Sequence, residues 1–257
     1  MIQRLKKAFG FPGLVPWDIN QGMNINLLTL RFKGELEDSF LEDYFLSSIG
    51  LMRISFILGA IYYSLFTILD WVTMPMVFRE LLIIRFGLVI PVISGVFILS
   101  FSAKFQRWWQ FAAGFTTLIT GLGIVLMTLL PVDLIRTSYY PGMILILIYC
   151  YLLIRLRYIY ASLTGWLIVG LYGLSLVLIP GVDSRITVIN LFFLISANIL
   201  GMFGGYALEF FTRKEFYHRY LLNLEREKVT QVNQELENRV QEKTHDLEEN
   251  IKNLEAL

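Results

Sequence analysis

The chain has 257 residues, of which 56% are hydrophobic and only 17% are charged. A typical soluble domain carries about a quarter charged residues, so this composition argues against a purely soluble globule. The 22 basic and 21 acidic side chains nearly cancel, which gives no global field for binding nucleic acid, and a single cysteine, Cys150, excludes an intramolecular disulfide framework and a cysteine-rich metal site.

The first part of the chain, residues 1–47, is polar and contains two helical patterns. Residues 1–9 are basic and amphipathic, which predicts a helix lying on the membrane surface or, alternatively, a disordered leader. Residues 35–47 predict a second helix that runs into the first membrane span. The proline- and glycine-rich stretch at 9–17 is too short for the apolar core of a cleavable signal peptide.

The middle zone contains six apolar stretches, and crossing a bilayer as a helix takes about 20 residues. The first and second stretches contain Arg53 and Arg85, the fourth is short, and Pro91 lies inside the second, where it is expected to kink the helix. The predicted spans are 48–69, 81–102, 109–130, 138–154, 158–180 and 187–211.

The distribution of basic residues predicts the orientation of these spans. The loops at 103–108 and 155–157 contain two basic residues each, and the N-terminal segment and the start of the tail are also basic, whereas the other three loops contain about one each. This alternation predicts a multi-pass protein of the cell inner (plasma) membrane with both termini in the cytoplasm.

The third zone, residues 212–257, has no proline or glycine and is dominated by Glu, Lys, Gln, Leu and Arg. Apolar residues recur every three or four positions, which predicts the seam of a parallel coiled coil. The spacing from Leu236 to Val240 departs from the heptad, and this offset either lets the seam shift between two registers or is an ordinary irregularity. The predicted seam consists of Val229, Val232, Leu236, Val240, Leu247, Ile251 and Leu254.

One such helix cannot bury its seam alone, so a second copy of the chain is the expected partner. Ala197, Gly201 and Gly205 form a ridge of small residues in the sixth span that lets two helices approach closely. We predict that this ridge belongs to the dimer interface, the alternative being that it packs inside one protomer. The expected fold class is all-α: an integral-membrane six-helix bundle with a C-terminal cytoplasmic parallel coiled coil, homodimeric.

The sequence contains no phosphate-binding glycine loop, no zinc-protease motif and no nucleophile elbow. The spans contain no histidine, which argues against a haem held by histidine in the membrane. No cofactor and no metal site are therefore expected, and the chain itself is not expected to be an enzyme. Because a coiled coil with nothing attached has no obvious task, an output domain is expected to follow the tail.

Polar residues inside apolar spans require an explanation, because burying them in lipid is costly. Several lie at the predicted outer ends of spans two, four and six, and they predict a pocket for the head group of a small amphiphilic ligand. Asn198 lies deeper and either contacts this ligand or forms an interhelical hydrogen bond. The candidate ligand-binding residues are Arg85, Tyr139, Tyr140, Asn190 and Asn198.

These polar residues also have purely structural explanations. Arg85 either forms an ion pair with Asp70 or Glu80 or extends its side chain to the membrane surface. At the predicted inner side, a cluster of ion pairs would fix the exit of the sixth span, although anchoring by positive charges explains the arginines without it. The residues of this predicted inner cluster are Arg53, Arg155, Arg157 and Glu209.

Three segments, IIRFGLVIPVI (83–93), LLIRLRYIYASLTGW (152–166) and FFLISANILGMFGGYALEFFTRKEF (192–216), resemble the six-span membrane-associated sensor (MASE-type) regions of bacterial class III adenylate cyclases, diguanylate cyclases and histidine kinases. The resemblance covers about residues 35–220 and implies a sensory or anchoring module, but it transfers no binding residue. LENRVQEKTHDLEENIKNLEAL resembles the linker helices of sensor histidine kinases, which favours a kinase over a cyclase as the output.

The sequence thus predicts three parts: a cytoplasmic segment with interfacial helices (1–47), a six-span sensor domain (48–211) and a signalling coiled coil (212–257). The predicted function is a membrane sensor and dimerisation module that transmits a signal through its sixth span to a separate output domain. Its expected partners are a second copy, membrane lipids and the amphiphilic ligand, and no nucleic acid. The alternative is a small six-span transporter or channel, for which we see no internal repeat.

Overall fold

The computed structural model describes residues 23–130, 139–178 and 184–255. The chain divides into two compact units, one up to Phe210 and one from Phe211, which we call the membrane unit and the tail unit. All regular secondary structure in the described residues is helical apart from one β-bridge between Ile25 and Phe32, which confirms the all-α fold class. The helix expected at 1–9 lies outside the described residues.

Five helices of the described chain are long and apolar enough to cross a membrane, which makes the chain a membrane protein. They carry the first, second, third, fifth and sixth of the expected spans. The fourth expected span is the shorter apolar helix Tyr140–Leu153, and residues 131–138 before it are not described, so the six-helix bundle stays a prediction. The main helices are α3 (Glu35–Thr73), α4 (Phe78–Leu82), α5 (Ile90–Leu99), α6 (Trp109–Thr128), α8 (Tyr140–Ile148), α9 (Tyr158–Leu178) and α10 (Ser184–Glu255).

Helix α3 joins the helix expected at 35–47 to the first span without a break, so the predicted domain boundary at residue 47 falls inside one helix. Acidic residues in its first turn, among them Glu35 and Glu37, suit the positive end of the helix dipole. Glu37 also accepts a hydrogen bond of 2.9 Å from the backbone N–H of Phe32, which ties the preceding loop to the start of the helix.

Two spans contain a π-helical turn, in which the backbone hydrogen bonds reach one residue further than in an α-helix. The first, η3 (Ile83–Val89), ends two residues before Pro91. Proline lacks an N–H and its ring collides with the carbonyl four residues earlier, which explains a widened turn at this place, while the expected kink stays a prediction. The second, η5 (Tyr149–Leu153), follows α8 directly and ends the apolar helix Tyr140–Leu153.

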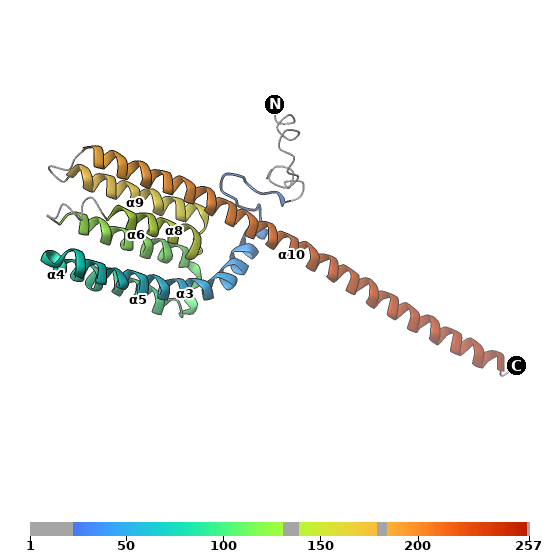
Figure 1. The fold of residues 1–257 in the computed structure, drawn as a ribbon. Coiled ribbons are helices and arrows are strands. Elements are labelled where there is room, and N and C mark those ends of the chain that lie inside the picture. Colours follow the sequence, from blue (N-terminus) through green and yellow to red (C-terminus); the bar gives the residue numbers. More distant parts are fainter. Residues whose placement is uncertain (1–22, 131–138, 179–183, 256–257) are drawn as a thin grey trace, which may run out of the picture. The chain divides into compact units, whose positions relative to one another are not determined.

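Helix α6 lies at the centre of the membrane unit and contacts η3, α5, α8 and α9 (Figure 1). It is the most buried of the apolar helices, and its buried positions are rich in glycine, alanine and threonine. Small side chains let neighbouring helices approach closely where lipid gives no hydrophobic drive for association. The sequence of α6 therefore explains its central place.

Helix α10 is continuous for 72 residues, from the start of the sixth span into the tail unit. This confirms the expectation that no helix breaker separates span and tail. Within the tail unit, the side chains of the described seam residues Val229, Val232, Leu236 and Val240 are 53–62% exposed. The side chains of Leu247, Ile251 and Leu254 lie outside the described part of the chain.

Candidate functional site

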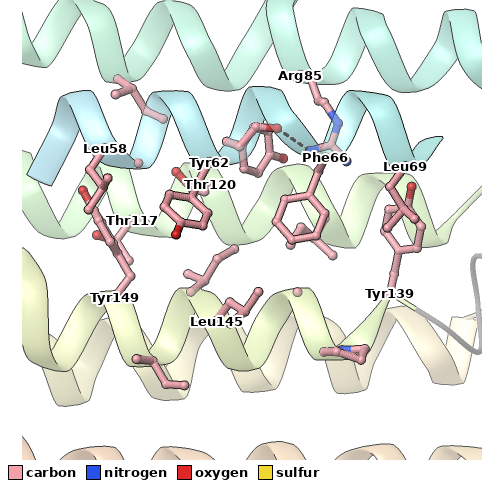
Figure 2. Close-up of a pocket in the computed structure, with 18 of the residues that line it drawn as sticks. Leu58, Tyr62, Phe66, Leu69, Arg85, Thr117, Thr120, Tyr139, Leu145 and Tyr149 are labelled. Atoms are coloured by element: carbon pink, nitrogen blue, oxygen red, sulfur yellow. Dashed lines mark hydrogen bonds between the residues drawn. The ribbon is translucent and has the colours of Figure 1, made fainter. Parts of the chain in front are cut away.

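A cavity of about 630 Å³ lies in the membrane unit between α3, α6, α8 and the two π-helical turns. Its walls are mostly apolar, and its volume lies in the range of small-molecule sites, about 300–1,000 Å³. Figure 2 shows that it extends along the helices, with Leu58 and Tyr149 at one end and Arg85 and Tyr139 at the other. The cavity therefore has the elongated shape of a site for a chain-like molecule.

The polar end of the cavity contains a buried ion pair. The guanidinium of Arg85 donates from Nε to Oδ2 of Asp70 at 2.8 Å and from Nη1 to the carbonyl of Tyr63 at 3.0 Å. The hydroxyl of Tyr139 donates to the other carboxylate oxygen of Asp70. Only 3% of Arg85 and 1% of Asp70 is exposed, so the two charges neutralise each other within the protein. The ion pair that the sequence offered as an alternative role for Arg85 is present.

The other end of the cavity is formed by η5. The hydroxyl of Tyr149 donates to the backbone carbonyl of Ser55 in α3 at 2.8 Å, and its ring lies against Gly59 of the same helix. This hydrogen bond fixes the tyrosine across the gap between η5 and α3. Any occupant of the cavity that reaches this end would contact Tyr149.

The α6 wall carries the hydroxyls of Thr116, Thr117 and Thr120. Each donates to the backbone carbonyl four residues earlier, at 2.8, 2.9 and 2.8 Å respectively. Because their hydroxyl hydrogens are already used in this way, these threonines need no acceptor in the cavity. The wall is therefore suited to apolar groups.

The rim of the cavity is formed by apolar side chains that are also exposed on the surface of the membrane unit. Leu58, Tyr62 and Leu69 of α3 and Leu145 and Ile148 of α8 are 39–59% exposed. In a membrane protein, such a surface contacts the acyl chains of lipids. The cavity is thus accessible sideways, between α3 and α8, from the bilayer.

The structure brings together two of the five predicted ligand-binding residues, Arg85 and Tyr139. Tyr140 and Asn190 do not line the cavity, and Asn190 instead donates to the hydroxyl of Tyr172 in α9 at 3.1 Å. Asn198 accepts a hydrogen bond from Tyr151, so it has the interhelical role that was its alternative. The prediction placed these residues together because they lie at a similar depth in the membrane. Residues at the same depth can nevertheless point in different directions around their helices.

Several residues of the cavity were not predicted. Thr116, Thr117 and Thr120 form a stripe of hydroxyls in an otherwise apolar span, and this pattern was a usable signal. Tyr149 gave no such signal, because its position depends on the π-helical turn of η5.

The same turn connects the cavity to α10 through Tyr151. Its hydroxyl donates to Oδ1 of Asn198 at 2.9 Å, and its ring lies on Gly201 and Gly205. A methyl group at Gly201 would overlap this ring. Gly201 and Gly205 thus pack inside the protomer, which was the alternative for this ridge, and Ala197 of the same ridge is half-buried. The role of the ridge in a dimer stays a prediction.

A second polar cluster connects α3, α9 and α10 at the opposite end of the membrane unit from Asp70. Arg157 lies 3.2 Å from Glu37 and 3.6 Å from Glu209, and Glu209 accepts a 2.6 Å hydrogen bond from the backbone N–H of Tyr158. The predicted contact of Arg157 with Glu209 is therefore present.

The contacts of Arg53 and Arg155 differ from those expected for a shared ion-pair cluster. Arg53 instead donates to the hydroxyl and carbonyl of Ser100 at 3.0 and 2.6 Å, at the end of α5. Nε of Arg155 is buried without a hydrogen bond, whereas its backbone carbonyl accepts from Tyr44 and Gln110. A cation at a helix C-terminus is stabilised by the helix dipole, which explains the position of Arg53.

We expect Glu209→Ala to lower the free energy of unfolding by about 2–3 kcal/mol, because hydrogen bonds to a buried charged group are lost. Glu209→Gln should cost less, since its amide oxygen still accepts from Tyr158. Chemical unfolding in detergent micelles measures both, with the exposed Glu80→Gln as control. Equal stability of Glu209→Ala and the parent protein would contradict this role of Glu209.

The described residues contain no group of three or more His, Cys, Asp or Glu side chains that could hold a metal ion. The sequence matches no protein-family model and no curated protein. The cavity and the continuous helix α10 are therefore the features on which a functional proposal rests.

Proposed function

We propose that the chain is a membrane sensor and dimerisation module, in which occupancy of the cavity is passed through the last span and the tail to a cytoplasmic output unit. A histidine kinase or a class III adenylate cyclase is the proposed type of output. In this proposal the chain is a parallel homodimer in the plasma membrane with both termini in the cytoplasm. The single observation that carries it is the unbroken course of α10 from the contact with Tyr151 into the tail.

The turn η5 supports the proposal because it lies between the cavity and α10. Tyr149 borders the cavity, and Tyr151, two residues later, lies on α10. Residues two apart in a helix point to nearly opposite sides, so a ligand that displaces Tyr149 also moves Tyr151. π-helical turns are frequent at functional sites, which favours η5 as the moving part.

The exposed seam of the tail unit supports a dimer. Val229, Val232, Leu236 and Val240 are apolar residues at coiled-coil spacing on a helix that is otherwise highly charged. A second copy of the same helix would bury them as knobs in holes. Rotation or sliding of α10 would then change the register of the paired tails.

Cysteine cross-linking of the full chain in membranes tests this proposal. The one native cysteine, Cys150, is buried, so an introduced cysteine reports its own contacts. We expect Leu236→Cys and Val240→Cys to form disulfide-linked dimers efficiently. Asn238→Cys is the matched control, because it lies two and a half turns from Val229 and therefore on the opposite face of the helix.

The expected result is at least a fivefold excess of dimer at the seam positions over Asn238→Cys. Equal cross-linking at all three positions would indicate random collision, and no cross-linking at any of them would indicate a monomer. Either result contradicts the proposed dimerisation module.

A further inference from the structure

Resting on the proposed function, we propose that the cavity binds an uncharged single-chain amphiphile with a hydroxyl head, such as a long-chain alcohol, which enters sideways from the bilayer. Its hydroxyl lies at the end formed by Asp70, Arg85 and Tyr139, and its chain extends toward Tyr149. This assigns a chemical class to the ligand that the sensor responds to.

Among the described lining residues, the charges at the polar end of the cavity, Arg85 and Asp70, cancel, which disfavours an ionic head. An anion placed near Arg85 would also lie near the carboxylate of Asp70, which is 2.8 Å from that guanidinium, and a cation near Asp70 would lie near Arg85. Attraction and repulsion would largely cancel, while the ligand would still lose the hydration of its charge. A neutral head avoids this loss.

The hydrogen bonds already present favour a head that can both donate and accept. The hydroxyl of Tyr139 donates to Asp70, and that of Thr73 donates to the carbonyl of Leu69 at 2.7 Å. Both of these hydroxyl hydrogens are therefore used, and their oxygens can still accept. The hydroxyl of Tyr63, which also lines the cavity, is buried without a hydrogen-bond partner and can still donate. An alcohol can donate to the first two oxygens and accept from Tyr63, whereas an ester or a ketone can only accept.

The dimensions of the cavity fit one alkyl chain. From Gly59 to Asp70 the α3 wall rises by eleven residue steps, which is about 16 Å at 1.5 Å per step. The volume of about 630 Å³ suits a single chain and is too small for a two-chain phospholipid. The exposed apolar rim between α3 and α8 gives such a chain a direct path from the lipid.

Photolabelling of the full chain in phosphatidylcholine nanodiscs tests the ligand class. The probe is 1-tetradecanol carrying a diazirine in its chain, and the competitors are 1-tetradecanol, tetradecanoate at alkaline pH and tetradecyltrimethylammonium, which share one chain and differ in charge. We expect label in the peptides that contain Tyr62 and Leu145. The alcohol should compete at least tenfold better than either ion.

Two tryptophan variants locate the site. Leu145→Trp narrows the mouth of the cavity at a half-exposed position and should reduce labelling at least fivefold. Leu174→Trp is the matched control, because Leu174 is 55% exposed on α9 and does not line the cavity, so its labelling should be unchanged. Competition by tetradecanoate equal to that by the alcohol, or equal labelling of both variants, would overturn the inference.

This experiment is separate from the test of the sensor itself. Photolabelling needs no dimer, and cross-linking at the seam needs no ligand, so each proposal can fail while the other survives. Coupling between ligand binding and the tail is tested by measuring seam cross-linking with and without 1-tetradecanol. If 1-tetradecanol changes seam cross-linking in the parent chain and not in Leu145→Trp, the cavity and the seam are coupled. If the cavity is labelled but seam cross-linking does not change, the sensor proposal is overturned while the ligand site stands.

Discussion

Asp70→Ala is expected to lower the free energy of unfolding of the membrane unit by about 3–5 kcal/mol, because it leaves a buried guanidinium without its counter-charge. Arg85 is 3% exposed and its Nε donates to Asp70 at 2.8 Å. The hydroxyl of Tyr139 would lose its acceptor in the same variant. Chemical unfolding in detergent micelles, followed by tryptophan fluorescence, measures the change.

A double variant separates the cost of one unpaired buried charge from the net contribution of the ion pair to the free energy of unfolding. Replacing a buried ion pair by apolar residues of similar volume is often neutral, so Asp70→Leu combined with Arg85→Met should recover most of the lost stability. The exposed Glu80→Gln serves as the control for a nearby acidic residue. If the double variant is as unstable as Asp70→Ala, the loss does not come from the uncompensated charge of Arg85.

Gly201→Ala is expected to destabilise the membrane unit by about 1–3 kcal/mol, the usual cost of adding a group to a well-packed core. The added methyl would overlap the ring of Tyr151 in the same chain. Gly204→Ala is the matched control, because nothing outside its own turn of helix lies within 4 Å of the position that its methyl would occupy. The measurement is again chemical unfolding in micelles, made on both variants.

The same pair of variants distinguishes packing within one chain from packing between two. Tyr151→Leu removes the ring, so it should restore part of the stability that Gly201→Ala loses. If Gly201 instead lies at a dimer interface, Gly201→Ala will weaken dimerisation while leaving unfolding of the monomer unchanged. That outcome would contradict the observed contact with Tyr151.

The membrane helices were largely predictable because they depend on local composition. Long apolar stretches predicted the five helices that could span a membrane, and the lack of glycine and proline after Gly205 predicted that α10 continues into the tail. Pro91 predicted a kink in the second span, and the structure has the π-helical turn η3 just before this proline. Backbone hydrogen bonding in lipid leaves few alternatives to a helix, so these features needed no knowledge of the neighbours.

The candidate site was predictable only in part. Arg85 stood out as a charge in an apolar span, and its pairing with Asp70 was among the expected alternatives. Tyr149 did not stand out, since a tyrosine in an apolar helix has many possible neighbours. The small-residue ridge allowed two opposite interpretations, because the sequence pattern for close helix packing is the same within one chain and between two.

The sequence alone determined that the chain is helical, that it is a membrane protein, and that its last span continues as a charged helix with an apolar seam, because hydropathy and helical periodicity act along a single segment. Only the tertiary structure decided that Arg85, Asp70 and Tyr139 meet at one end of a cavity, that Tyr151 covers Gly201, and that Asn190 pairs with Tyr172. These contacts depend on the rotation of each helix about its own axis, which is set by the packing of side chains from distant segments and has no signature within any one of them.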